Sequence, residues 1–195
     1  MAKTPLAVVE FFRAACGHKK CKPDPTNGRE SPNKKEIIMK KINLLVFVFF
    51  LPCIVNAQCF DKAGKYYNLD PDYLRAIAWK ESRYKTNAIG KNNDGSKDIG
   101  IMQINSSNIE KLKRAFPLIN VKNLIDYPCL NISVGAYILN ENFKRYGRNW
   151  LAVGVYNAGV KNNKKRVNIR YHYAKEINQY YNQIKRNELL LPRIE

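Results

Sequence analysis

The sequence has little histidine. Two histidines occur in 195 residues, no HExxH pair is present, and residues 58–195 contain a single histidine, His172, and no paired Cys or His spacing typical of a metal site. A GxSxG nucleophile elbow and a Gly-rich phosphate loop are also missing. These absences remove most protease classes, and we expect neither a metal nor a cofactor.

Acidic residues are scarce as well, with 16 Asp and Glu against 34 Lys and Arg and a net charge of +18. Such an excess fits an anionic partner such as nucleic acid, a membrane face or an acidic polymer. A nucleic-acid binder would carry its basic and aromatic residues in one stripe. Here the basic residues are spread over several predicted helices, with one dense run at Lys161, Lys164, Lys165 and Arg166. We therefore expect no nucleic-acid partner.

The apolar run at residues 44–51 is too short to span a membrane comfortably. It follows the positive stretch Met39-Lys40-Lys41 and precedes Val55-Asn56-Ala57, which is the pattern of a secretory signal peptide. We expect residues 39–57 to be this signal, cleaved after Ala57, and the product to be periplasmic; a retained anchor is the alternative. Residues 1–38 are then an upstream extension of the reading frame or a disordered leader.

Two of the five cysteines, Cys59 and Cys129, lie beyond the predicted signal peptide. Export places them in an oxidising compartment, where a pair of cysteines is expected to form a disulfide. The alternative is two unrelated buried thiols.

Residues 58–186 are predicted to form one compact, mainly α domain of α+β type. Apolar residues make up 45% of the chain, enough for a packed core. The apolar run at 99–105 is predicted as a small strand, a hairpin or a loop against the core, beside a polar cleft loop at 85–98. Residues 187–195 are expected to be a flexible tail. Periodicity and end signals predict helices at 59–68, 71–84, near 108–115 (from a Ser107/Glu110 capping box), 128–146, 150–157 and 169–184.

Glu81 occupies a position where the helix pattern asks for an apolar residue. Asp70 is a suitable N-cap, and Leu74, Ile77 and Ala78 mark the buried face of the helix that follows. The next position on this face is Glu81, and burial would raise its pKa toward that of a proton donor near neutral pH. The alternative is that the helix ends there and Glu81 turns into water or pairs with a lysine.

Three short motifs now stand in order: Glu81-Ser82 at a helix end, GIMQIN at 100–105 and YNAG at 156–159. Together they resemble the motifs of soluble lytic transglycosylases with a goose-type lysozyme-like fold. Residues 92–98 and the two cysteine positions look like the small branch that accompanies type III and type IV secretion systems and conjugation machinery. The resemblance covers about residues 59–184.

The resemblance implies a monomeric enzyme that cleaves the β-1,4 bond between N-acetylmuramic acid and N-acetylglucosamine in peptidoglycan glycan strands. It assigns Glu81 as the single acid/base and leaves a 1,6-anhydromuramyl end on the product. It also implies a role beside a type III or type IV secretion or conjugation apparatus. The residues that it places against the substrate are Ser82, Met102, Gln103, Asn105, Tyr156 and Asn157.

Two alternatives to this function remain open, and the first depends on Asp94 and Asp98. If Asp94 or Asp98 faced Glu81 across a water, the enzyme would be a lysozyme-type muramidase that hydrolyses the same bond. We expect instead that both cap backbone amides in their turn segment. A catalytically idle peptidoglycan-binding assembly protein is the other alternative, and the presence of Glu81 argues against it.

Overall fold

The structure is a computed structural model that describes residues 57–192 and 194. The predicted leader and nearly all of the predicted signal peptide lie outside these residues. Within them, none of the helices has the length and apolar character needed to cross a membrane. The elements in order are α2 (Ala57–Tyr67), α3 (Pro71–Ser82), β1 (Ile89–Lys91), β2 (Lys97–Ile99), β3 (Ile104–Asn105), the 3-10 helix η1 (Ser106–Asn108), α4 (Ile109–Leu112), α5 (Val121–Asp126), α6 (Pro128–Tyr146), α7 (Trp150–Ala158) and α8 (Lys164–Lys185).

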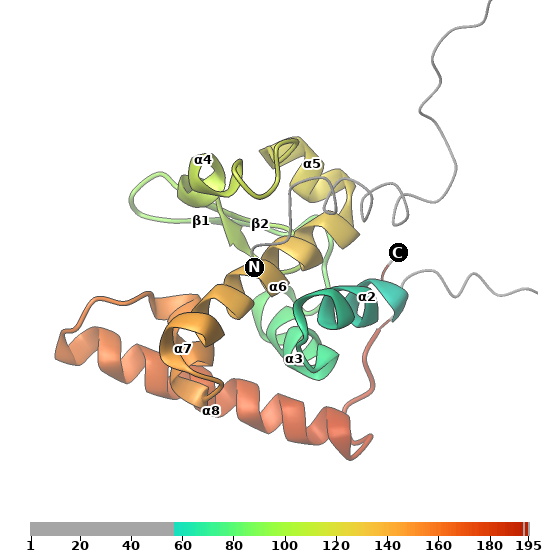
Figure 1. Cartoon of the computed structure of the whole chain (residues 1–195), viewed down its shortest axis with the longest axis vertical. Helices are drawn as coiled ribbons and strands as arrows, with labels where there is room; N and C mark the ends of the chain where they lie inside the picture. Colours follow the sequence, from blue (N-terminus) through green and yellow to red (C-terminus); the bar gives the residue numbers. More distant parts are fainter. Residues whose placement is uncertain (1–56, 193, 195) are drawn as a thin grey trace, which may run out of the picture.

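Helix α6 lies between the two parts of the domain (Figure 1). The three-stranded sheet, α4 and α5 lie on one side of it, and α7 and the long α8 lie on the other. Pro128 starts α6 and Gly147 follows its last residue, as predicted from the sequence. Helix α6 packs against α2 and α7 and also against α5 and β3, so it connects the sheet to the helical part.

The sheet is antiparallel, with strand order β1-β2-β3. The apolar run at 99–105 contributes the end of β2 and all of β3, joined by a turn in which Gly100 and Gln103 have φ of 75° and 48°. The predicted small strand is therefore confirmed at β3, whereas the loop predicted at 85–98 contains β1 and most of β2.

Asn131, in α6, fixes that turn against the helix. Its Nδ2 donates to Ile99 O (2.8 Å) and Leu124 O (3.1 Å), and its Oδ1 accepts from Met102 N (2.9 Å). The side chain is fully buried. Because each of these bonds satisfies a backbone group away from water, Asn131 holds the sheet turn in a single position.

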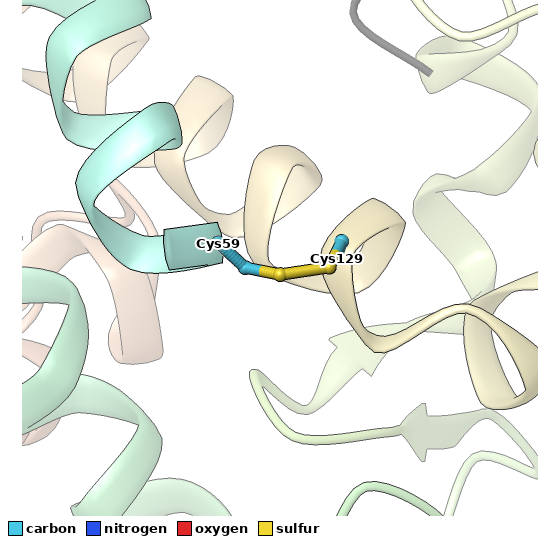
Figure 2. Close-up of a disulfide and its surroundings, with 2 residues drawn as sticks. All are labelled: Cys59 and Cys129. Carbon is cyan, nitrogen blue, oxygen red and sulfur yellow. A yellow bond between two sulfur atoms is a disulfide. The ribbon is translucent and has the colours of Figure 1, made fainter. Parts of the chain in front are cut away.

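The disulfide between Cys59 and Cys129 is present and joins the start of α2 to the start of α6 (Figure 2). The two Cα atoms are 5.3 Å apart, and 70 residues separate the cysteines in sequence. This confirms the predicted pairing.

Several helix ends differ from the sequence predictions, and two of the differences have a clear local cause. Helix α3 ends at Ser82 and not at residue 84, because Arg83 and Tyr84 adopt left-handed φ angles of 52° and 67°. Helix α8 begins at Lys164, five residues earlier than predicted, because the Asn163 side chain accepts a hydrogen bond from Arg166 N and caps it.

The predicted capping box was wrong, and one short helix was missed. Asn105, and not Ser107, caps the turn that precedes α4, since its Oδ1 accepts from Ser107 N at 2.9 Å. Helix α5 was not predicted. Beyond α8, Ile194 is buried and Leu191 packs against the core, so these two side chains of the predicted tail lie on the domain.

Candidate active site

Helix α3 presents Glu81 at the end of its buried face. Leu74, Ile77 and Ala78 are fully buried, and Glu81 continues their row as a partly buried carboxyl. Asp70 Oδ1 accepts from Asp72 N at 3.0 Å and caps the helix start. The carboxyl therefore sits on a rigid element in the place predicted by the sequence.

Glu81 opens into a cleft of about 1030 Å³. Its lining comes from the sheet and α4, from α6, and from α7 with the loop that follows it. Within the described residues no cluster of His, Cys, Asp or Glu is arranged to hold a metal ion. The lining residues include Glu81, Asp94, Asp98, Gln103, Asn105, Lys111, Ile138, Asn142, Arg145, Tyr156 and Asn157.

Burial raises the pKa of Glu81 from 4.5 to about 7, and the charge of Asp98 also raises it. Two contacts act in the opposite direction: a hydrogen bond from Tyr173 and the charge of Lys80. Tyr173 Oη donates to Glu81 Oε1 at 2.6 Å. At neutral pH the carboxyl is therefore divided between its acid and base forms, which suits a group that first gives and then takes a proton.

Tyr156 lies beside this carboxyl. Its Oη donates to Met102 O at 3.0 Å, and burial together with the charge of Glu81 raises its pKa well above the ordinary value. Gly135 of α6 allows the close approach, since a Cβ there would lie 3.0 Å from Tyr156 Oη and 2.7 Å from Met102 Cε. Tyr156 is thus a neutral hydroxyl fixed at the cleft wall.

Gln103 and Asn105 both line the cleft, as predicted, but their amides are already engaged. Gln103 Nε2 donates to Gly100 O at 2.8 Å. Asn105 Nδ2 donates to Asp98 Oδ1 at 2.8 Å. Both side chains therefore hold the sheet in shape as well as facing the cleft. Asn157 lines the cleft from α7 with an exposed side chain.

Two predicted substrate contacts do not hold in this structure. Ser82 is buried, and its Oγ donates to Ile101 O at 2.8 Å, so it ties the end of α3 to the turn before β3. Met102 is fully buried and packs on Gly135 below the cleft surface. Both residues shape the site from behind and do not face a ligand.

The two aspartates behave differently from one another. Asp94 Oδ1 accepts from Ser96 N at 3.0 Å, as expected for a turn-capping residue. Asp98 lies on β2 and caps no backbone amide; its two oxygens accept from Asn105 Nδ2 at 2.8 Å and Asn92 Nδ2 at 3.0 Å. Asp98 is thus held as a fixed carboxylate on the cleft wall.

Tyr173 is the site residue that the sequence did not single out. It lies on the buried face of α8 with Ala174 and Ile177, and it is 4% exposed. Its contact with Glu81 joins residues 92 positions apart. A tyrosine hydroxyl on the buried face of α8 was the available signal, because a buried tyrosine usually finds a hydrogen-bond partner.

Known proteins resemble this chain in both sequence and fold. A family model for the transglycosylase SLT domain matches residues 58–180. The X polypeptide of Escherichia coli is 44% identical over 148 residues, which cover 75% of this chain and 86% of that protein. Invasion protein IagB of Salmonella typhimurium is 46% identical over 129 residues, covering 66% and 78%. Protein IpgF of Shigella flexneri is 43% identical over 139 residues, covering 69% and 89%.

Among solved structures, an inactive mutant of the lytic transglycosylase Slt from Pseudomonas aeruginosa matches with a TM-score of 0.54 and 22% identity. The match covers 72% of this chain and 25% of that chain. At this identity the likeness is one of fold, and it confirms the predicted mainly helical, lysozyme-like class.

Proposed function

The chain belongs to the transglycosylase SLT domain family, and from this membership we propose that it is a peptidoglycan lytic transglycosylase. The substrate is the glycan strand, cleaved at the β-1,4 bond between N-acetylmuramic acid and N-acetylglucosamine. Glu81 acts as the single acid and base. The observation that carries this proposal is a carboxyl that opens into the cleft with its pKa raised to about 7.

In the first step the protonated Glu81 gives its proton to the glycosidic oxygen, and the bond from that oxygen to the muramyl C1 breaks. The hydrogen bond from Tyr173 occupies Oε1, so Oε2 carries the proton. In the second step the Glu81 carboxylate takes the proton of the muramyl 6-hydroxyl while O6 attacks C1. The proton of the 6-hydroxyl regenerates the acid form of Glu81, a 1,6-anhydro ring forms, and no water is consumed.

Ordinary glycosidases need a second carboxylate, whereas substrate-assisted enzymes do not. Here the sugar's own hydroxyl is the nucleophile, and its N-acetyl group can support the charge that develops at C1. Tyr156 and Asn157 line the cleft where such a group would lie. These two residues therefore remain proposed substrate contacts.

Replacing Glu81 with Gln tests the assignment. Purified peptidoglycan is digested with the wild type and with Glu81→Gln, and the soluble fragments are identified by mass spectrometry. We expect anhydromuramyl fragments from the wild type and none above background from the variant. Release by Glu81→Gln at a rate near that of the wild type would reject Glu81 as the acid/base.

Asp98 supports one other candidate, a muramidase that hydrolyses the same bond. It lines the same cleft, and its charge reaches Glu81 strongly enough to raise that pKa. If Asp98 orients an attacking water, the wild type gives reducing muramyl ends, and Asp98→Asn abolishes them. If it acts only through its charge, Asp98→Asn leaves the anhydro product unchanged and lowers the upper pKa of the pH–rate profile.

We also propose that the enzyme is exported to the periplasm and opens the wall locally for a secretion or conjugation apparatus. Export is supported by the signal-peptide pattern at 39–57. The role beside an apparatus is supported by the similarity to a protein named invasion protein IagB. N-terminal sequencing of the exported protein should give Gln58. A mature chain that begins before Met39 would contradict this.

A further inference from the structure

The dense basic run at the start of α8 has no part in the proposed mechanism, and its members divide in the structure. Arg166 turns back to α7, where its Nη1 donates to Ala158 O at 3.4 Å and satisfies a carbonyl at the helix end. Lys164, at the first position of α8, is exposed. Its charge is therefore available to a partner outside the chain.

Lys164 begins a row of exposed side chains along α8. Val167, Tyr171 and Lys175 follow it at intervals of three and four residues, which puts all of them on adjacent turns of one side of the helix. Val167 is 42% exposed and Tyr171 is 64% exposed, and both lysines are exposed. We call these four residues the α8 face. Two apolar side chains thus lie between two cations.

The α8 face is separate from the core and from the cleft. The buried side of α8 consists of Arg170, Tyr173, Ala174 and Ile177. Helix α8, all of which the structure describes, contributes Arg166 alone to the lining of the cleft. The helix lies on the side of α6 away from the sheet (Figure 1). A partner can therefore contact the α8 face without entering the substrate site.

The surroundings of the α8 face are poor in carboxylates. Between Glu141 and Glu176 the chain has no acidic residue. Lys164 and Lys175 form no ion pair with any carboxylate in the part of the chain that the structure describes. Glu176 is paired with Lys80 of α3, at 2.6 Å from Nζ to Oε2. The charges of the two lysines are therefore not neutralised by the domain itself.

Another exposed tyrosine has both signs of charge beside it. Tyr127, between α5 and α6, is 47% exposed and directly follows Asp126, which pairs with Lys122. The charged residues of the α8 face, in contrast, are both lysines. Exposed apolar side chains among unbalanced cations are typical of surfaces that bind anionic lipid, because the apolar groups leave water while the ammonium groups stay at the level of the phosphates.

We propose that the α8 face binds the surface of a membrane that contains anionic lipid. Lys164 and Lys175 meet the lipid phosphates, and Val167 and Tyr171 enter the boundary between headgroups and acyl chains. The row runs along the helix, so all four side chains can meet one flat surface at the same time. A helix is convex, and a fluid lipid layer can follow it without a matching groove, which favours lipid over an acidic protein. The inference does not depend on the reaction at Glu81.

Co-sedimentation with lipid vesicles tests the proposal. The protein is purified in its exported form and mixed with vesicles of phosphatidylcholine, with or without phosphatidylglycerol. We expect binding to the vesicles that contain phosphatidylglycerol, weakening as the salt concentration rises, and much weaker binding to phosphatidylcholine alone. The phosphatidylcholine vesicles also measure any contribution of the apolar run at 44–51, which an uncleaved chain would retain.

Two lysine variants test the electrostatic part of the contact. Lys164→Gln and Lys175→Gln should each weaken binding to the phosphatidylglycerol vesicles about fivefold. Lys65→Gln is the matched control, because it removes the charge of an exposed lysine on α2. It should leave binding nearly unchanged. An equal loss with Lys65→Gln would show that net charge alone attracts the protein, and would overturn the proposal.

Tyr171→Ser separates a lipid surface from other anionic partners. It keeps every charge and removes the exposed ring, so binding to the phosphatidylglycerol vesicles should weaken several-fold. Tyr127→Ser, which removes an exposed ring elsewhere, should not weaken it. Vesicle binding that Tyr171→Ser leaves unchanged would show attraction by charge alone, as to any acidic polymer, and would overturn the proposal.

Two further results bear on the α8 face. Equal binding to the two kinds of vesicle would overturn the proposal, and no binding to either would overturn it in favour of an acidic protein partner. Cleavage of purified peptidoglycan, which contains no membrane, should be the same for Tyr171→Ser and the wild type. Vesicle binding without cleavage would reject only the proposed enzyme, and cleavage without vesicle binding would reject only the membrane contact.

Discussion

Glu81→Gln should make the protein more stable at pH 8 than the wild type but no more stable at pH 4. Glutamine has nearly the shape of protonated glutamic acid, and its amide oxygen can still accept the bond from Tyr173. At low pH the two proteins are therefore close to isosteric. At high pH only the wild type holds a charged group in a partly buried position.

The sign follows from the raised pKa of Glu81. Between pH 4.5 and about 7 the folded protein keeps a proton that the unfolded chain has already lost. The stability that Glu81 contributes is therefore fully present below pH 4.5 and is lost as pH rises through about 7. A rise from 4.5 to about 7, at about 1.4 kcal/mol per pKa unit, amounts to about 3 kcal/mol.

Urea unfolding of both proteins at several pH values between 4 and 8 measures this difference directly. All other titrating groups are shared, so they cancel when the two stabilities are subtracted. We expect the subtracted value to grow by about 3 kcal/mol in favour of Glu81→Gln between pH 4 and 8. A subtracted value that does not vary with pH would show that Glu81 has an ordinary pKa.

Three further changes have defined outcomes. Tyr173→Phe removes a bond that favours the ionised form of Glu81, so the falling limb of the pH–rate profile should move to higher pH while kcat drops; an unmoved limb would contradict this. Reducing the disulfide of Cys59 and Cys129, which closes a loop of 70 residues, should lower the free energy of unfolding by about 4 kcal/mol and so lower the melting temperature. If alkylation shows that both thiols are free in the exported protein, the bridge is contradicted. Asn131→Ala strands three buried backbone groups and should cost about 3 kcal/mol or more in chemical denaturation; a loss below about 1 kcal/mol would show that water replaces the amide.

The parts of the fold that the sequence predicted well are those with strong local signals. Helix α6 has a proline at its first position and a glycine after its last, so both ends were predicted correctly. The apolar row of α3 leads to Glu81 by simple periodicity. The disulfide followed from the number of cysteines beyond the predicted signal peptide.

The parts that were missed depend on contacts between distant residues. Tyr173 reaches Glu81 across 92 positions, and the pattern on α8 indicates a buried hydroxyl without indicating its partner. Sequence motifs place Ser82 and Met102 next to functional residues, but they do not say which way a side chain points, and both point into the core. Asp98 was expected to cap a turn, whereas pairing of β2 with β3 brings it to Asn105.

Digestion of purified peptidoglycan in water enriched in heavy oxygen tests the central claim most directly. If Glu81 passes its proton to the leaving oxygen and the sugar's own hydroxyl attacks C1, the wild type gives 1,6-anhydromuramyl ends without heavy oxygen. Reducing muramyl ends that carry heavy oxygen at C1 would show that water attacks, and would contradict the transglycosylase mechanism proposed for this cleft.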